Sequence, residues 1–387
     1  MKNTIRLLKF PIIYLAFLSS IAMIILTVTV VNSEAKPKIK KELFGKTTDG
    51  KAIEIYTLTN SKRAEAKIIT YGGTVVSLKV PDRKGNFDDV VLGYDNLDGY
   101  LNDTFYIGCL IGRYGNRIAK GKFSLNGAAY TLVQNNGENH LHGGTKGFDK
   151  VIWKAKSLVT KNGASLELSR LSKDGEEGYP GNLSVNVIYT LTDNNELKID
   201  YSATTDKDTV INLTQHSYFN LAGADSDDIL NHQLQINSDR FTPTDRGSIP
   251  TGELRIAKGT PFDFILPTAI GARIEQSDEQ LKFGSGYDHN FVLNKNNQAI
   301  TLAAKVYEKT SGRVMEVYTT QPAMQLYTGN FLVNVKGKSG KIYGKHDGFC
   351  LETQHYPNSP NEPQFPTTVL KPNQKYLQTT VYKFTTR

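Results

Sequence analysis

The amino-acid sequence predicts an all-β fold, one large antiparallel β-sandwich that spans residues 36–387. Alternating apolar and polar side chains mark two strands at 183–191 and 197–203, with turn-forming residues at 193–195 between them. Outside the N-terminus, no segment keeps a helical period for more than about ten residues. The 33 glycines and 14 prolines recur at short intervals, as a fold of many short strands requires.

Two further hairpin patterns support this fold class. Asn126-Gly127 separates β-rich runs at 122–125 and 128–133, and an Asn-Gly pair accepts the positive φ angles of a tight hairpin turn. Strands at 301–308 and 313–319 flank a second turn. Shorter β-rich runs occur at 66–70, 74–80, 90–92, 164–169, 233–236, 290–293, 349–353 and 379–384. Long, irregular connections favour a sandwich over a barrel.

The formal net charge of +8 is concentrated in the N-terminal tail. Residues 1–41 carry seven basic side chains and one acidic one, which leaves a net charge of +2 for the other 346 residues. A basic tail on a nearly neutral body is not a phosphate-binding surface, so the charge pattern excludes nucleic acid as the partner.

Residues 1–35 are predicted to be a signal peptide or an N-terminal membrane anchor. Three basic residues precede an uncharged stretch at 10–31, and Ser33-Glu34-Ala35 offers the small residues that a signal peptidase reads. The stretch of 22 residues is also long enough to span a bilayer, which needs about 20. We therefore expect an exported protein, periplasmic or extracellular, whose membrane contact is confined to residues 10–31.

The chain has two cysteines, Cys109 and Cys350, both among apolar neighbours. A disulfide scaffold needs more cysteines, so buried free thiols are the expectation.

His140 and His142 lie in a glycine-rich polar segment, NGENHLHGG. If this segment is extended, the two imidazoles share one face, because side chains alternate along a strand. A metal pair of this kind would need a third ligand such as Glu352. The alternatives are a cofactor-free polar site and histidines whose hydrogen bonds are satisfied within a loop.

Four more polar clusters lie between the predicted strands. They contain His216 (NLTQHSYFNL), Asp288 (GSGYDHNFVL), Glu352 (GFCLETQHYPN), and Asn116 with Arg117 (GRYGNRIAKG). Glu352 interrupts an apolar run, and burial there would raise its pKa toward the range of a general base. The alternative is a strand glutamate that faces solvent.

Together these motifs resemble those of the aldose 1-epimerases, the galactose mutarotases. GRYGNRIAKG, NHLHGG, DGEEGYPG, NLTQHSYFNL, GYDHN, TTQPAMQLYTGN and GFCLETQHYPN follow one another in the family's order. The resemblance covers nearly all of the chain after the N-terminal segment. It implies a β-supersandwich fold and interconversion of the α and β anomers of free aldoses, without a metal or a cofactor.

The resemblance also implies roles for individual residues. Glu352 would be the general base and His216 the general acid. The implied substrate-binding residues are Asn116, Arg117, His142, Asp288 and Gln325, with His142 at the ring oxygen. The chain departs from the family pattern at Gln215 and Tyr287, beside functional positions, which leaves the preferred sugar open.

The chemistry of anomer exchange is consistent with these roles. Opening a hemiacetal ring requires removal of the C1 hydroxyl proton and delivery of a proton to the ring oxygen, which a carboxylate and an imidazolium on opposite sides perform. The expected partner is a monosaccharide such as galactose or glucose, held by fixed polar groups and an aromatic wall. Three other functions stay open: a binding module without catalysis, a metalloenzyme, and a hexose-phosphate epimerase that uses Arg113 with Arg117.

Overall fold

A computed structural model describes residues 36–161, 163–295 and 299–387 of the chain. The predicted signal peptide or anchor at 1–35 lies outside the described residues. Within the described ranges, no helix has the length and apolar character needed to cross a membrane.

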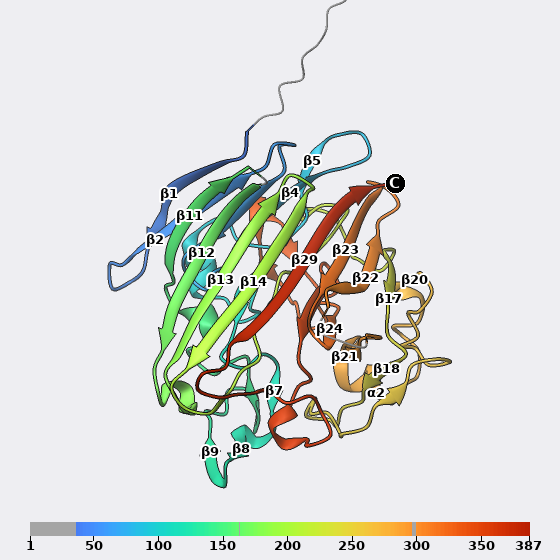
Figure 1. The fold of residues 1–387 in the computed structure, drawn as a ribbon. Helices are drawn as coiled ribbons and strands as arrows, with labels where there is room; N and C mark the ends of the chain where they lie inside the picture. Colours follow the sequence, from blue (N-terminus) through green and yellow to red (C-terminus); the bar gives the residue numbers. More distant parts are fainter. Residues whose placement is uncertain (1–35, 162, 296–298) are drawn as a thin grey trace, which may run out of the picture. The chain divides into compact units, whose positions relative to one another are not determined.

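The main sheet has nine antiparallel strands (Figure 1). In spatial order they are β11 (Lys154–Thr160), β12 (Gly163–Ser172), β13 (Leu183–Thr192), β14 (Glu196–Thr205), β29 (Tyr376–Thr386), β23 (Arg313–Thr319), β22 (Thr301–Tyr307), β17 (Gln233–Ile236) and β20 (Thr268–Ala269). The C-terminal strand β29 lies between β14 and β23, so it joins the two halves of the sheet.

The hairpins predicted from sequence are confirmed. The runs at 183–191 and 197–203 form β13 and β14, and those at 301–308 and 313–319 form β22 and β23. On β13 every second residue from Leu183 to Leu191 is buried, and the residues between them are more exposed, as the alternation requires. The Asn126-Gly127 turn joins β8 (Lys122–Leu125) to β9 (Ala128–Thr131).

Two five-stranded sheets lie behind the inner face of the main sheet. One consists of β1 (Lys38–Lys46), β2 (Ala52–Thr59), β3 (Glu65–Ile69), β4 (Val75–Pro81) and β5 (Phe87–Asp89). The other has the order β19 (Arg255–Ile256), β18 (Arg240–Thr242), β21 (Asp288–Val292), β24 (Ala323–Tyr327) and β27 (Cys350–Gln354). One continuous apolar core joins all three sheets, for example through Leu78, Val187 and Met324. The prediction of a large antiparallel sandwich is confirmed.

Short strand pairs and turns connect the sheets. The pairs are β6 (Leu110–Ile111) with β16 (Thr214–Gln215), β7 (Arg117–Ile118) with β10 (His140–Leu141), β15 (Thr209–Val210) with β28 (Val369–Leu370), and β25 (Val335–Lys336) with β26 (Ile342–Tyr343). Single 3₁₀ turns lie at Ala119–Gly121, Phe148–Lys150, Glu176–Gly178, Ile270–Ala272, Lys338–Gly340 and Ser359–Asn361.

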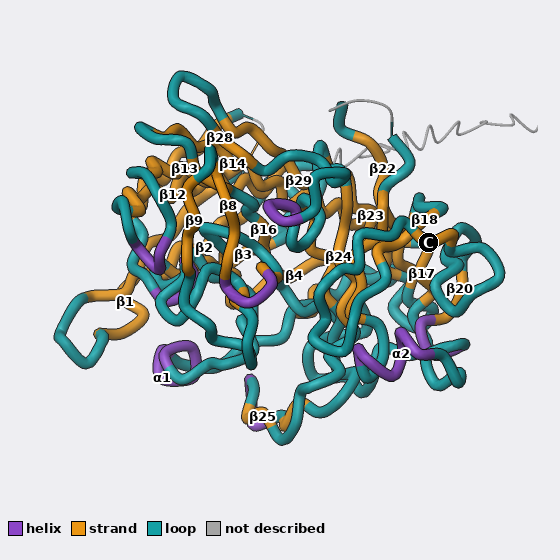
Figure 2. Tube along the Cα trace, turned by 90° about the horizontal axis from the view of Figure 1, so that it is seen from below, coloured by secondary structure: helices purple, strands orange, loops and turns teal. Residues whose placement is uncertain are grey.

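Helices are short, as the sequence predicts. The helix α1 (Leu97–Leu101) begins at Asn96, whose side chain accepts a hydrogen bond from the Gly99 amide. The helix α2 (Glu279–Gly284) begins at Asp278 in the same way, and the two helices lie well apart (Figure 2). Both cysteines are buried free thiols, which confirms that prediction.

Candidate active site

The floor of the candidate site is one face of the sheet that contains β21, β24 and β27. Strand register aligns Asn290, Gln325 and Glu352 in one row across this sheet. Because side chains alternate, the same face carries the row two residues away, which includes Asp288 and Tyr327. The opposite face carries Phe291, Met324, Leu326 and Leu351 and packs into the core. Alternation therefore buries the apolar residues and leaves the polar rows to form a site.

The wall facing this floor comes from two of the short strand pairs. His216 follows β16, and its backbone is held by hydrogen bonds to Cys109 and Gly108 on the adjoining segment. His142 follows β10, where it adopts a left-handed φ of 52° and its amide donates to the Asn116 carbonyl. The two imidazole rings lie edge to face with centroids 5.3 Å apart. Segments about 70 residues apart in the chain thus place two histidines side by side.

These elements enclose a cavity of about 360 Å³. Its lining comprises Thr104, Phe105, Tyr106, Asn116, Arg117, Asn136, Leu141, His142, His216, Tyr218, Asp288, Tyr327, Phe331 and Glu352. Six of the seven site residues that the resemblance implies line this cavity. Gln325 does not. It is buried beneath Asp288 and donates a hydrogen bond of 2.7 Å to Oδ1 of that carboxylate, so it orients Asp288.

A polar network lines one side of the cavity. Arg117 donates from Nε to Oδ1 of Asn136 at 3.0 Å, and its Nη1 lies 3.8 Å from Oδ2 of Asp288. Gln354 in turn donates to Oε1 of Gln325 at 3.2 Å. A guanidinium and a carboxylate held in this way present fixed donors and acceptors to a polyol.

Glu352 and His216 form the candidate reactive pair. Oε1 of Glu352 lies 3.6 Å from Nε2 of His216, and the two residues are 2% and 4% exposed. The second carboxylate oxygen, Oε2, is buried and makes no hydrogen bond to the residues that the structure describes. A buried oxygen is stabilised by a hydrogen bond, so Oε2 is available to a ligand that enters the cavity.

Burial disfavours the charged form of both members of this pair. Burial, reinforced by Asp288, raises the pKa of Glu352 well above 4.5, while Arg117 opposes the shift. Burial lowers the pKa of His216 to about 4. At neutral pH the two groups therefore share one proton, which suits a base and an acid that exchange roles.

His142 is a hydrogen-bond donor to the cavity. The backbone amide of Asn116 donates to Nδ1 of His142 at 3.2 Å. Burial, reinforced by His216 and Arg117, holds the pKa of His142 well below 6.5, so the ring is neutral. A neutral imidazole that accepts at Nδ1 carries its proton on Nε2. His142 therefore offers an N–H group to an oxygen of the ligand.

This protonation pattern does not fit a metal site. The nearest metal-ligating atoms of His142, His216 and Glu352 lie within 4.8 Å of one another. A ligating histidine needs a free lone pair on one nitrogen and usually donates a proton from the other, whereas Nδ1 of His142 faces a donor.

Of the interpretations left open for His140 and His142, the metal pair is not formed, and His140 is a histidine whose hydrogen bonds are satisfied by its surroundings. The ring of His140 bonds to the Tyr179 hydroxyl at 2.6 Å and to the Val133 carbonyl at 2.7 Å, and it does not line the cavity. The left-handed backbone at His142 breaks the strand alternation on which the prediction depended.

Arg113 stabilises the fold and does not line the cavity. Its guanidinium is buried and donates to the carbonyls of Pro180 and Gly181 at 2.8 and 2.9 Å. The arginine pair that a hexose phosphate would require is therefore not formed, because Arg117 faces the cavity without Arg113.

The sequence predicts an aromatic wall but does not identify the residues that form it. Tyr218 and Tyr327 flank His216, with ring centroids 5.1 and 6.3 Å from the imidazole. Phe331 stacks on Tyr327 at the rim and is 50% exposed. The motifs SYFNL and QLYTGNF contain these rings, so the predicted aromatic wall had a local signal.

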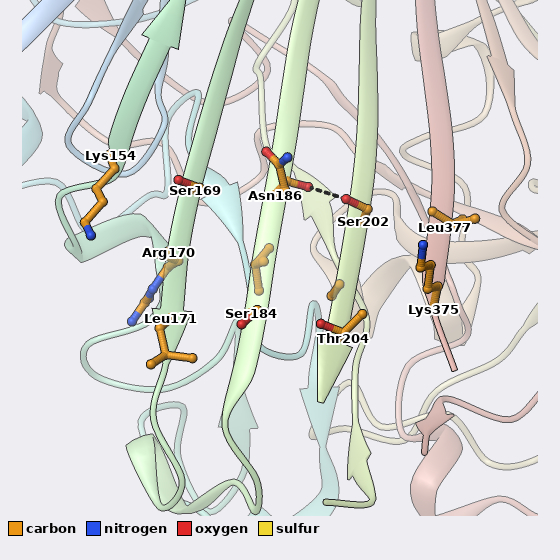
Figure 3. A pocket seen from close by; sticks show the side chains of 12 residues that line it. Lys154, Ser169, Arg170, Leu171, Ser184, Asn186, Ser202, Thr204, Lys375 and Leu377 are labelled. Carbon is orange, nitrogen blue, oxygen red and sulfur yellow. Dashed lines mark hydrogen bonds between the residues drawn. The ribbon is translucent and has the colours of Figure 1, made fainter. Parts of the chain in front are cut away.

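A second hollow of about 540 Å³ lies on the outward face of the main sheet (Figure 3). Serine, threonine and asparagine side chains line it together with Lys154, Lys375 and two leucines. It contains neither a carboxylate nor a histidine, so it has no acid–base pair.

Comparison with known proteins agrees with this geometry. The sequence profile described as aldose 1-epimerase matches residues 54–383. The chain belongs to the aldose 1-epimerase family. It is 50% identical over 325 residues to galactose mutarotase of Bos taurus, covering 84% of this chain and 92% of that protein. It is 37% identical over 338 residues to aldose 1-epimerase of Escherichia coli (strain K12), covering 87% and 96%.

Solved structures give the same family assignment. Galactose 1-epimerase from Lactobacillus acidophilus superposes with a TM-score of 0.80 at 28% identity, covering 91% of this chain and 99% of that one. An aldose epimerase homologue from C. elegans gives 0.77 at 31% identity, covering 84% and 96%. The family membership and supersandwich fold predicted from the motifs are therefore confirmed.

Proposed function

We propose that this protein is an aldose 1-epimerase that interconverts the α and β anomers of free hexoses, with Glu352 as general base and His216 as general acid. The observation that carries this proposal is the Glu352–His216 pair, 3.6 Å apart at the floor of a cavity, with Oε2 of Glu352 unpartnered among the described residues.

Burial favours the form of the pair with its one proton on Glu352, so transfer of that proton to Nε2 of His216 precedes ring opening and produces the carboxylate and the imidazolium. Glu352 removes the proton of the C1 hydroxyl while Nε2 of His216 delivers a proton to the ring oxygen. The C1–O bond of the ring breaks, and C1 becomes an aldehyde. Each proton transfer contributes about 10²–10⁴-fold to the rate.

Ring closure reverses both transfers. Rotation about C1–C2 presents the other face of the aldehyde to the C5 hydroxyl. His216 takes the proton of that hydroxyl, and Glu352 returns a proton to the carbonyl oxygen. The pair is then in its starting state, so the cycle balances without an added reactant.

His142 and the polar network hold the sugar during this cycle. The Nε2–H group of His142 donates a hydrogen bond to the ring oxygen. This bond stabilises the negative charge that develops on that oxygen as the ring opens. Arg117 and Asp288 bind the hydroxyls on the other side of the ring. An aromatic wall at Tyr327 and Phe331 contacts the apolar face of the sugar.

Galactose is the first substrate to test. The support is the identity to galactose mutarotase from Bos taurus, and glucose is the second candidate. Initial rates of polarimetric change with freshly dissolved α-galactose, α-glucose, α-xylose and α-arabinose, corrected for spontaneous exchange, measure the preference. Catalysis of none of these exchanges would contradict the proposal. Sugar binding without exchange would favour a binding module.

We also propose that the enzyme is exported and acts on sugars outside the cytoplasm. The support is the basic start, the uncharged stretch at 10–31 and the small residues around Glu34 in the sequence.

A further inference from the structure

Tyr106 occupies an unusual backbone conformation beside His142 and His216. Its φ is 59°, in the left-handed region that bulky L-residues rarely adopt. Such conformations persist only where the surrounding structure imposes them, and they gather at ligand-binding sites. The conformation of Tyr106 therefore points to a functional role for its side chain.

The partly buried carboxylate of Asp103 holds this conformation. The two oxygens of Asp103 accept hydrogen bonds from the amides of Phe105 and Ile107, at 3.0 and 2.8 Å, on either side of Tyr106. The Tyr94 hydroxyl donates to the same carboxylate at 2.6 Å. Nζ of Lys150 donates to the Asp103 carbonyl at 3.1 Å. The segment 103–107 is thus held from several sides.

This conformation places the ring of Tyr106 against both histidines. Its centroid lies 4.6 Å from that of His142, in an edge contact, and 6.0 Å from that of His216. Tyr106 also lines the cavity. A ligand that reaches the reactive pair therefore passes next to this side chain.

The hydroxyl of Tyr106 differs from those of the other cavity tyrosines. The Tyr218 hydroxyl donates to the Phe105 carbonyl at 2.8 Å, and the Tyr327 hydroxyl accepts from the Phe331 amide at 3.0 Å. The Tyr106 hydroxyl makes no hydrogen bond to any residue in the described part of the chain. Burial raises its pKa, so it stays protonated and can both donate and accept.

We propose that the Tyr106 hydroxyl hydrogen-bonds a specific hydroxyl of the sugar and thereby determines substrate specificity. This inference rests on the proposed function, since it takes a sugar as the ligand of the cavity. The rigid segment 103–107 fixes the hydroxyl in place before the sugar arrives, which is how a site discriminates between epimers and deoxy analogues.

The test compares the wild type with Tyr106→Phe, which removes the hydroxyl and keeps the ring. We expect KM for galactose to rise about three- to tenfold, the value of one neutral hydrogen bond, with kcat changed by less than about twofold. Tyr130→Phe is the matched control. Tyr130 lies on the β8–β9 hairpin away from the cavity, and its substitution leaves KM unchanged.

Monodeoxy sugars identify the sugar hydroxyl that hydrogen-bonds Tyr106. Both proteins are assayed with 2-, 3-, 4- and 6-deoxygalactose. The effect of Tyr106→Phe disappears for the one sugar that lacks the partner hydroxyl and persists for the others. The proposal would be overturned if Tyr106→Phe had the same KM for galactose as the wild type, or if its effect were equal for all four deoxy sugars. Either result is expected if the ring of Tyr106 only packs on His142.

Isothermal titration of galactose separates this inference from the proposed function. Failure of the wild type to exchange anomers of any sugar would contradict the enzymatic proposal. Weaker galactose binding by Tyr106→Phe than by the wild type would still support the role of the hydroxyl, and equal binding would refute it.

Discussion

The sulfur of Cys350 lies 3.5 Å from Nδ1 of His216, and Cys350 projects from the same face of β27 as Glu352. One short strand therefore holds the proposed base, Glu352, beside Nε2 of the imidazole and a thiol, Cys350, beside Nδ1. Burial raises the pKa of the Cys350 thiol well above 9, so the S–H group stays intact. A thiol both donates and accepts weakly, so it remains a partner when His216 gains or loses its proton.

Cys350→Ala should lower kcat about two- to tenfold, because Nδ1 loses its side-chain partner and the ring is less well oriented. Cys350→Ser, which keeps a donor and an acceptor, should recover most of the activity. Steady-state polarimetry with α-galactose measures both. Equal losses in Cys350→Ala and Cys350→Ser would contradict a role for the hydrogen bond of Cys350 in positioning the imidazole.

Glu352→Gln should lower kcat at least about 10²-fold, because an amide cannot take the C1 hydroxyl proton. His216→Asn should have a similar effect, because it removes the proton donor to the ring oxygen. The double variant should lose less than the product of the two single effects, since the residues act as a unit. Polarimetry corrected for spontaneous exchange gives the rates.

His346→Asn is the matched control for these variants. His346 is buried, bonds to the Thr328 carbonyl and does not line the cavity, so kcat should be nearly unchanged. A Glu352→Gln enzyme within about threefold of the wild type would refute the assignment of the base.

The pH profile of kcat/KM should be a broad bell. The active state holds one proton on the Glu352–His216 pair. A second proton is taken up by His216, whose pKa burial lowers to about 4, so activity falls near that pH instead of near 6.5. The last proton leaves with the raised pKa of Glu352, so the alkaline limb lies well above 4.5. An acid limb near pH 6.5 would contradict this account of the buried pair.

Glu352→Gln should raise the thermal midpoint at pH 7. The folded-state pKa of Glu352 lies above its unfolded value, so the folded form retains a proton that the unfolded form loses. Stability is therefore lost as pH rises from the unfolded pKa toward the folded one, at about 1.4 kcal/mol for each unit of difference. Calorimetry should show the gain at pH 7 and its disappearance below about pH 4.

Glu308→Gln is a control for which we expect the opposite change in the thermal midpoint at pH 7. Burial opposes its ionisation, but hydrogen bonds from Ser311 and Thr310 hold the pKa of Glu308 below 4.5. Its charge therefore stabilises the fold above the unfolded pKa, and Glu308→Gln should lower the midpoint at pH 7. A lower midpoint in both variants would show that loss of packing, and not charge burial, dominates at Glu352.

Residues 1–35 should be absent from most copies of the mature protein if the export proposal is correct. Mass spectrometry of intact protein from the soluble and membrane fractions tests this. Recovery of the full-length chain from the cytosol would contradict export, and its recovery from the membrane would indicate a retained anchor.

Much of the fold was predictable because alternation is a local property. The pattern in β13 and β14 follows directly from one buried and one less buried face. The order of strands in the main sheet was not predictable, since nothing local places β29 between β14 and β23.

The site was predictable to a lesser degree. The motifs pointed to Glu352 and His216, but their contact depends on the register of β24 and β27 and on the pairing of β16 with β6. Single backbone angles decided two further cases. The left-handed φ at His142 separated it from His140, and the one at Tyr106 brought an unremarked side chain into the cavity.

The position of β29 has a consequence for how the chain acquires its structure. The final strand, Tyr376–Thr386, supplies the inner neighbours of both β14 and β23, so the two halves of the main sheet stay unjoined until the last residues have been synthesised. Pairing across such long sequence separations is slow, because closing a long loop carries an entropic penalty before any contact forms. The main sheet therefore cannot close before this strand has emerged from the ribosome. If the export proposal is correct, this late closure leaves the two halves of the sheet unjoined while the earlier part of the chain crosses the membrane.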